Sequence, residues 1–165
     1  TGAGSSLRNL RRFMSQVLRE ILLFEAGGRM FGLPVGDVDR VVHAVRPVPL
    51  PHGPAFVEGL LNLHGTAIPV LDLNVWFGDA PRDVGLGDLM IVLRAGSARV
   101  ALHAEHARGV ATVTVSAIQP ATAVLASADH FAGVVMIEDK IVLLPDVASF
   151  LAAARSVELR EATAA

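Results

Sequence analysis

The densest group of side chains that could bind a metal or transfer a proton is the run His103-Ala104-Glu105-His106. If this run lies in a β-strand, His103 and Glu105 share one face and His106 points to the other. A metal site would then need a third ligand from a distant part of the chain, which the spacing does not supply. The run therefore predicts a polar strand face and no metal site. The other histidines are scattered and are expected to face solvent: His43, His52, His64 and His130.

No other segment shows the pattern of a catalytic or cofactor site. The run Gly85-Leu86-Gly87-Asp88 lacks the third glycine and the following helix of a nucleotide-binding loop. None of the serines sits in a nucleophile elbow. The chain contains no cysteine, which excludes disulfides, thiolate metal ligands and cysteine nucleophiles. We therefore expect a protein without enzymatic activity and without a cofactor.

The composition is that of one folded domain. The 165 residues are 52% hydrophobic and 18% charged, with 15 glycines, 9 prolines and a net charge of -2. This charge gives no basic surface for nucleic acid or anionic lipid. No apolar run reaches the ~18 residues of a membrane helix, and the start of the chain shows no apolar signal-peptide core. The expected location is the cytoplasm, without direct membrane insertion.

An amphipathic helix is predicted over residues 6–19, in front of the β-rich part of the chain. Its apolar residues recur at steps of three and four: Leu7, Leu10, Met14, Val17 and Leu18. Such a stripe has to be buried, and two interpretations are open. It either caps the domain itself or docks on a partner, and the partner could be a second copy of the chain.

The first half of the chain predicts short strands. Segments 21–25 and 30–35 flank a Gly-Gly turn and form a hairpin, while 37–45 could be one helical turn that leads into a strand, which the spacing alone does not settle. The proline-rich segment 46–54 must be an extended loop. Strands follow at 57–63 and 66–73, around a turn at His64-Gly65, and a polar connector covers 78–87.

The second half repeats this rhythm of hairpin, strand, loop and hairpin. Strands are predicted at 89–94, 99–105, 108–115, 131–137 and 141–144, and Asp146 can cap a final helix. About ten short strands, divided into two groups near residue 80, are typical of small barrels. The shared rhythm of the halves indicates pseudo-twofold symmetry.

The segment from Pro54 to Leu73 resembles the signature of the CheW family of chemotaxis coupling proteins. It reads PAFVEGLLNLHGTAIPVLDL, with an aromatic residue, a glycine, an Asn-Leu-x-Gly turn and an apolar-Pro-apolar-Asp-Leu strand in the family's order. The signature falls on these positions: Gly59, Asn62, Leu63, Gly65, Pro69, Asp72 and Leu73. The resemblance covers residues 20 to about 152 and leaves residues 1–19 as an extension.

The resemblance implies a mostly β fold of two SH3-like, five-stranded barrels related by a pseudo-twofold axis, with an extra N-terminal helix and a C-terminal helix. We expect barrel one at about 20–50 and 57–77, barrel two at about 88–145, and a closing helix at about 146–158, within a CheW-like domain of residues 20–155.

The resemblance also implies a non-enzymatic adaptor, which links a chemoreceptor's cytoplasmic tip to the regulatory domain of a CheA-type histidine kinase. The predicted partner-binding residues lie on the third strand and the signature segment: Val38, Arg40, Val41, Gly59, Leu61, Asn62, Leu63, His64 and Gly65. From the residues alone, a backbone role in turns and at strand ends is the favoured interpretation of Gly59, Gly65, Asn62 and Asp72.

Three positions depart from the family pattern. The family usually has arginine at the position of His64, a carboxylate at that of Arg40 and arginine at that of Asn74. An imidazole does not replace a permanently charged guanidinium without loss, and a reversed charge changes which partners are tolerated. We therefore hypothesise a coupler matched to its own receptor or kinase.

Three other functions are compatible with the sequence. The chain could be a CheW-like scaffold of a non-flagellar pathway that controls surface motility or gene expression. It could also be a regulatory module cut from a larger kinase, since that kinase's terminal domain shares the fold. A barrel that binds a small ligand is the third.

Overall fold

The computed structural model of the chain describes residues 4, 6–9, 17–121 and 131–164, with side chains as far as Val157. Residues 6–9 are helical, and most of the remaining predicted N-terminal helix, residues 10–16, lies outside the described residues. The helix was predicted to reach residue 19, which is wrong, because the first strand begins at Leu18. Its backbone pairs there with Thr114 of a distant strand, a contact that helical periodicity does not reveal.

Eleven strands and two short 3₁₀ turns make up most of the described part of the chain. The first half contains β1 (Leu18–Ala26), β2 (Arg29–Pro34), η1 (Val35–Asp37), β3 (Val38–His43), β4 (Val57–Leu63), β5 (Thr66–Leu71) and the helix α2 (Leu73–Trp76). The second half contains β6 (Leu89–Ala95), β7 (Ala98–Ala104), β8 (His106–Thr114), η2 (Val115–Ala117), β9 (Gln119–Pro120), β10 (Phe131–Ile137), β11 (Lys140–Pro145) and the helix α4 (Val147–Ala164). The predicted strands are confirmed, except that the strand predicted over 66–73 ends at Leu71 and gives way to α2. The undecided segment 37–45 is mainly strand β3, and the short strand β9 was not predicted.

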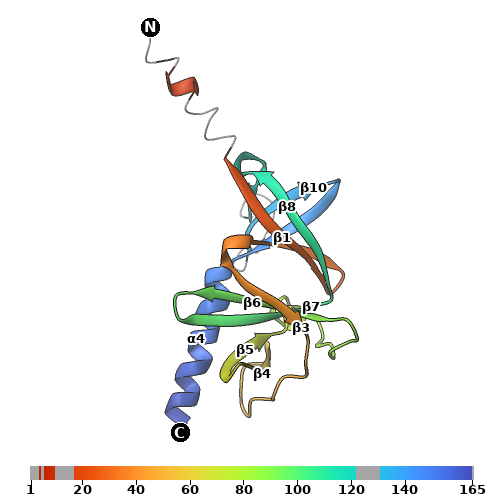
Figure 1. Cartoon of the computed structure of the whole chain (residues 1–165), viewed down its shortest axis with the longest axis vertical. Helices are drawn as coiled ribbons and strands as arrows, with labels where there is room; N and C mark the ends of the chain where they lie inside the picture. Colours follow the sequence, from red (N-terminus) through yellow and green to blue (C-terminus); the bar gives the residue numbers. More distant parts are fainter. Residues whose placement is uncertain (1–3, 5, 10–16, 122–130, 165) are drawn as a thin grey trace.

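The strands form two sheets, one above the other in the view of Figure 1. The six-stranded sheet has the order β8-β1-β2-β11-β10-β9, and the five-stranded sheet has the order β3-β6-β7-β5-β4. Most neighbours are antiparallel, but β11 pairs with β2 and β5 with β7 in parallel. The mostly β fold with two sheets of five to six strands agrees with the predicted fold class.

The predicted division of the strands near residue 80 is wrong. The hairpin β1–β2 belongs to the sheet that holds β8 to β11, and the hairpin β6–β7 belongs to the sheet that holds β3 to β5. Each half of the chain thus gives its first hairpin to the sheet of the other half. The 3₁₀ turn η1 interrupts the chain after Pro34 and sends β3 into the second sheet. Strand pairing of this kind is non-local, so the order of strands along the sequence cannot predict it.

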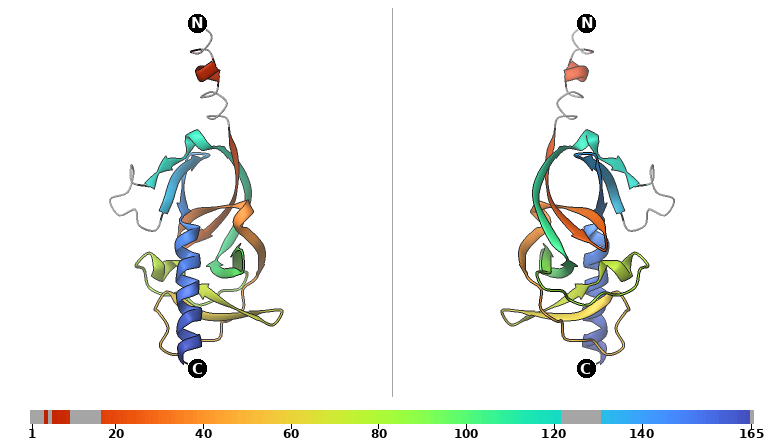
Figure 2. Two further views of the ribbon diagram at one scale, coloured as in Figure 1. Left: turned by 90° about the vertical axis from the view of Figure 1, so that its left-hand side faces the viewer. Right: turned by 90° about the vertical axis from the view of Figure 1, so that its right-hand side faces the viewer.

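One large core cluster joins the two sheets and α4. Phe24 and Phe31 from the six-stranded sheet, Ile91 and Leu102 from the five-stranded sheet, and Phe150 from α4 all belong to it and are essentially inaccessible to solvent. Each such side chain contributes about 1.5–3 kcal/mol when fully buried. Figure 2 shows α4 running alongside the five-stranded sheet, which it contacts through β5, β6 and β7.

Candidate functional site

The predicted partner-binding residues lie on the two outermost strands of the five-stranded sheet and in the turn between β4 and β5. β3 lies at one edge and carries Val38, Arg40 and Val41, and β4 lies at the other edge. Both strands also supply apolar side chains to one smaller core cluster, Val42 from β3 and Leu61 and Leu63 from β4. The sequence signature therefore contributes to a core as well as to a surface.

The β3 residues differ in exposure. A bulge between Val38 and Arg40 interrupts the pairing of β3 with β6. Val38 is half-buried against the large core, while Arg40 and Val41 are exposed. The Arg40 Nε donates to Asp39 Oδ2 at 3.3 Å, and Asp39 also lies 3.9 Å from a nitrogen of Arg94. The edge strand thus presents an apolar side chain beside a charged group that is already partly paired.

The turn between β4 and β5 exposes Asn62, His64 and Gly65. His64 and Gly65 both have positive φ, at 51° and 87°, the combination that a two-residue type I′ hairpin turn requires. The Gly65 N–H donates to Asn62 Oδ1 at 2.9 Å. Histidine tolerates this left-handed conformation better than most side chains with a Cβ atom. The turn is therefore fixed by local backbone geometry, and its side chains remain open to solvent.

Two of the predicted contact residues are buried, which corrects their assignment. Leu61 is only 4% exposed and packs inside the smaller cluster. Gly59 is buried where β4 passes the preceding loop, because a Cβ atom there would clash with the backbone carbonyl of Val48. Neither residue can touch a partner unless the sheet opens. Leu63 is half-buried.

Asp72 of the signature has a structural role at the start of α2. It is buried, and its Oδ1 accepts from the N–H groups of Asn74 and Val75 at 2.9 and 3.4 Å. These are the helix N-terminal groups that would otherwise lack a partner. The next residue, Leu73, enters the large core. Asn74, the third departure from the family pattern, is half-buried beside the turn between β1 and β2, where a Cβ atom on Gly27 would meet its side chain.

A buried charged cluster surrounds His103 and was not predicted from the sequence. The His103 Nδ1 lies 2.7 Å from Glu58 Oε1, and its Nε2 lies 2.7 Å from Asp88 Oδ2. Asp88 also accepts from the Gly85 N–H at 2.8 Å. We call Glu58, Asp88 and His103 the His103 cluster. Glu58 and Asp88 lie 45 and 15 residues from His103 in the sequence, so no short motif reveals the cluster. The only sequence signal is that single charged or titratable residues stand within or beside apolar strands.

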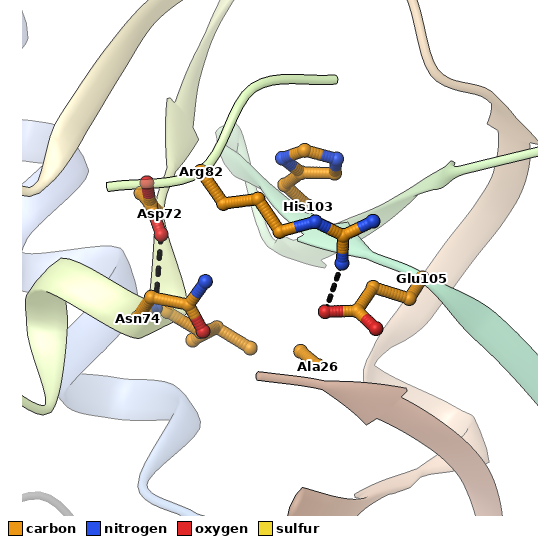
Figure 3. Close-up of a pocket in the computed structure, with 7 residues that line it drawn as sticks. Ala26, Asp72, Asn74, Arg82, His103 and Glu105 are labelled. Carbon is orange, nitrogen blue, oxygen red and sulfur yellow. Dashed lines mark hydrogen bonds and ion pairs between the residues drawn. The ribbon is translucent and has the colours of Figure 1, made fainter. Parts of the chain in front are cut away.

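The expected polar strand face at residues 103–106 is only partly correct. His106 is exposed, whereas His103 is buried within the cluster. The carboxylate of Glu105 pairs with Arg82 (Figure 3). It also accepts from the Gly27 N–H at 2.8 Å. Among the described residues, no group of three or more histidine and acidic side chains is arranged to hold a metal ion.

The ionisation of the His103 cluster follows from its contacts. Burial alone would lower the pKa of His103, but the hydrogen bonds and charges of Glu58 and Asp88 outweigh it and raise that pKa above 6.5. Burial would raise the pKa of Asp88, but the Gly85 N–H and His103 lower it below 3.8. Both carboxylates thus favour the protonated form of the imidazole that lies between them.

Comparisons with known proteins place the chain in a family. A family model described as the CheW-like domain matches residues 20–155. The chemotaxis protein CheW of Rhizobium meliloti (strain 1021) is 26% identical over 145 residues, which cover 87% of this chain and 94% of that protein. The protein FrzA of Myxococcus xanthus is 30% identical over 118 residues, which cover 71% and 74% of the two chains.

A solved structure agrees with the fold. The crystal structure of the scaffolding protein TtCheW from Thermoanaerobacter tengcongensis matches with a TM-score of 0.72 and 26% sequence identity, over 79% of this chain and 90% of that chain. Among the described helices, none combines the length and the apolar character needed to cross a membrane. The family model covers well over half of the sequence, and the chain therefore belongs to the CheW-like family.

Proposed function

We propose that this chain is a non-enzymatic scaffold that couples chemoreceptors to a CheA-type histidine kinase. The observation that carries the proposal is the family match over residues 20–155, which includes both sheets and the start of α4. A scaffold needs an ordered surface and no reacting groups. The charged groups that are brought together inside the protein, the His103 cluster, already satisfy one another.

The exposed part of the predicted site is the proposed contact surface. It consists of Arg40 and Val41 on β3 and of Asn62, His64 and Gly65 in the β4–β5 turn, all of which are open to solvent. Val38 and Leu63 support these segments from half-buried positions. Val41 is 41% exposed, and burial of an apolar side chain at an ordered edge strand favours association.

The proposed location is the cytoplasm, at the membrane only through the receptor. The predicted self-association through the N-terminal helix stays a separate proposal, because residues 10–16 lie outside the described part of the chain. The chain resembles FrzA as well as CheW proteins, so the identity of the captured kinase is what assigns the chemosensory pathway.

The test is affinity capture from the source cells with the wild type, Val41→Asp and Leu86→Asp as baits. Leu86 is fully exposed on the connector and is not one of the proposed contact residues, so its replacement controls for an added charge. We expect mass spectrometry to identify a CheA-type kinase and a chemoreceptor with the wild type and Leu86→Asp, and to lose at least one of them with Val41→Asp. A folded wild type that captures neither contradicts the proposal.

A further inference from the structure

The connector between α2 and β6, residues 77–88, is attached to the sheets by charged side chains. Arg29 of β2 contacts Asp79 at 2.5 Å, and Arg82 pairs with Glu105, which follows β7. At its end, Asp88 contacts His103 of β7. The Asp79 pair is solvent-exposed and contributes little to stability. The contact between Asp88 and His103 differs from this exposed pair, because both of its side chains are buried.

The geometry of His103 requires a proton on each ring nitrogen. Both nitrogens lie 2.7 Å from a carboxylate oxygen, and an ionised carboxylate only accepts hydrogen bonds. A neutral imidazole has one N–H, so it would leave one nitrogen lone pair facing a carboxylate. The doubly protonated ring is therefore the form that fits the cluster, and it links β4 through Glu58 to the connector through Asp88.

When His103 loses its proton, few groups nearby can offset the negative charges of Glu58 and Asp88. Arg82 lies 3.6 Å from Asp88, but it is shared with Glu105 (Figure 3). Arg82 and His103 line a small polar pocket, and Asp72 adds a further carboxylate to its lining. Met90, the cross-strand neighbour of His103 on β6, carries no charge. Without the imidazolium, Glu58 and Asp88 are two like charges in a largely buried place.

We propose that the His103 cluster is a proton-operated switch that holds the connector 77–88 against the five-stranded sheet when His103 is protonated and releases it when the proton is lost. Retention requires the imidazolium to bridge Glu58 and Asp88. Release begins at Asp88, whose Oδ2 accepts from the Gly85 N–H and from His103 together. The bond from the Gly85 N–H lies inside the connector, so loss of the His103 contact breaks the link between the connector and β7.

The raised pKa of His103 sets the direction of the response. The interaction is fully present below the unfolded value of 6.5 and is lost as the pH rises through the higher folded pKa. The lowered pKa of Asp88 keeps that carboxylate ionised throughout this range. A rise of pH through the folded pKa of His103 therefore loosens the connector, and acidification toward 6.5 tightens it.

Release changes the shape of the protein surface. The connector and the loop after β3 border an open hollow of about 300 Å³, and its lining includes Arg46, Pro47, Glu58, Pro81, Arg82 and Asp83. Glu58 belongs to both the hollow and the cluster. Movement of the connector would widen this hollow and free the Glu58 carboxylate toward it.

Two measurements on the purified protein test the switch. The first is an NMR titration of the His103 ring, which reports its pKa and the protonation of each nitrogen. The second is hydrogen exchange of residues 77–88 from about pH 5.5 to about pH 8.5, corrected for the intrinsic rate, in the wild type, His103→Gln and His106→Gln. His106 is exposed on the neighbouring strand and serves as the matched control.

We expect both ring nitrogens to carry protons at pH 6.5. Corrected exchange of the connector should rise through the His103 pKa, by about tenfold for each unit by which that pKa exceeds the unfolded value. His103→Gln should exchange fast at every pH, and His106→Gln should behave as the wild type. A ring that titrates at or below 6.5, or wild-type exchange that does not change with pH, overturns the proposal. The titration needs no variant, so an unfolded His103→Gln does not remove the test.

Discussion

Gly59 and Gly133 occupy equivalent positions in the two halves of the chain. Each follows a bulge near the start of a hairpin, β4–β5 in one case and β10–β11 in the other. Each also lies against the backbone of an earlier segment, so that a Cβ atom on Gly59 would clash with the carbonyl of Val48 and one on Gly133 would lie 2.8 Å from the carbonyl oxygen of Gln119. The close approach fixes where the chain crosses each hairpin.

Replacing either glycine with alanine should destabilise the fold. Gly59→Ala and Gly133→Ala are each expected to lower the free energy of unfolding by about 1–3 kcal/mol, because backbone atoms must move to admit the methyl group. Gly36→Ala is the control, since open space surrounds that position and its φ is not positive. Urea unfolding of the three variants measures the difference. Equal stability of Gly59→Ala and Gly36→Ala would contradict the packing argument.

Leu61 is buried and Val41 is exposed, so replacing each in turn distinguishes an effect on folding stability from an effect on partner binding. Leu61→Ala should cost about 2–5 kcal/mol, because it leaves a cavity in the smaller core cluster. Val41→Ala removes a side chain that is 41% exposed and should change stability by less than about 1 kcal/mol. Thermal unfolding and kinase binding are measured on both. A stable Leu61→Ala that selectively loses binding would restore Leu61 as a contact residue.

The sequence predicts the elements of this fold better than their assembly. Turns such as Ala26-Gly27-Gly28-Arg29 and the prolines of residues 46–54 mark where strands end, because they restrict the local backbone. The exchange of the hairpins β1–β2 and β6–β7 between sheets depends on contacts between distant residues. No local pattern specifies the parallel pairing of β2 with β11 or of β5 with β7.

The candidate site shows the same limit. The signature locates the β4–β5 turn correctly, but alternation along β4 does not say which face meets solvent when both faces are largely apolar. Leu61 was predicted as a partner-binding residue from the resemblance alone, and its burial depends on contacts with distant strands. The His103 cluster was missed because Glu58, Asp88 and His103 come from three separate segments. A histidine and a glutamate within apolar strands were the signal that could have paired them.

Asp72, the carboxylate that caps α2, should contribute more to the free energy of unfolding than Asp83, an exposed carboxylate of the connector. Asp72→Ala is expected to lower the free energy of unfolding by about 1–2 kcal/mol, because two backbone N–H groups at the start of α2 lose their acceptor. Asp83→Ala changes an exposed carboxylate of the connector and should stay within about 0.5 kcal/mol of the wild type. Denaturant unfolding compares the two. An Asp72→Ala variant as stable as Asp83→Ala would mean that water replaces the cap at no cost.

The dependence of global stability on pH should have two limbs. The lowered pKa of Asp88 contributes stability that is present above 3.8 and is lost as the pH falls through its lower folded value. The raised pKa of His103 contributes stability that is present below 6.5 and is lost as the pH rises through its higher folded value. The free energy of unfolding should therefore be largest between these ranges.

Unfolding by urea at a series of pH values measures both limbs. His103→Gln should flatten the alkaline limb, while His106→Gln should retain it, because His106 is exposed and takes no part in the cluster. An alkaline limb that persists unchanged in a folded His103→Gln would assign the effect to another group.

Restoring the family's usual charges tests the hypothesis of a coupler matched to its own partners. The double change His64→Arg and Arg40→Glu places a guanidinium in the exposed β4–β5 turn and a carboxylate on the exposed edge strand β3. It should strengthen binding to the kinase and receptor of a CheW protein that has the usual residues, and weaken binding to the chain's own partners. Titration calorimetry with both sets of partners measures these two changes in affinity.

The backbone at His64 sets the control for this experiment. Its φ of 51° favours histidine and asparagine over arginine, so His64→Arg should also lose a little stability. His64→Asn keeps the turn geometry without adding a charge and should leave the affinity for the usual partners low. Because Asp39 already pairs with Arg40, Arg40→Glu also places two carboxylates side by side, and raising the salt concentration should reduce that repulsion. If the double variant binds both sets of partners as the wild type does, these positions do not determine the choice of partner.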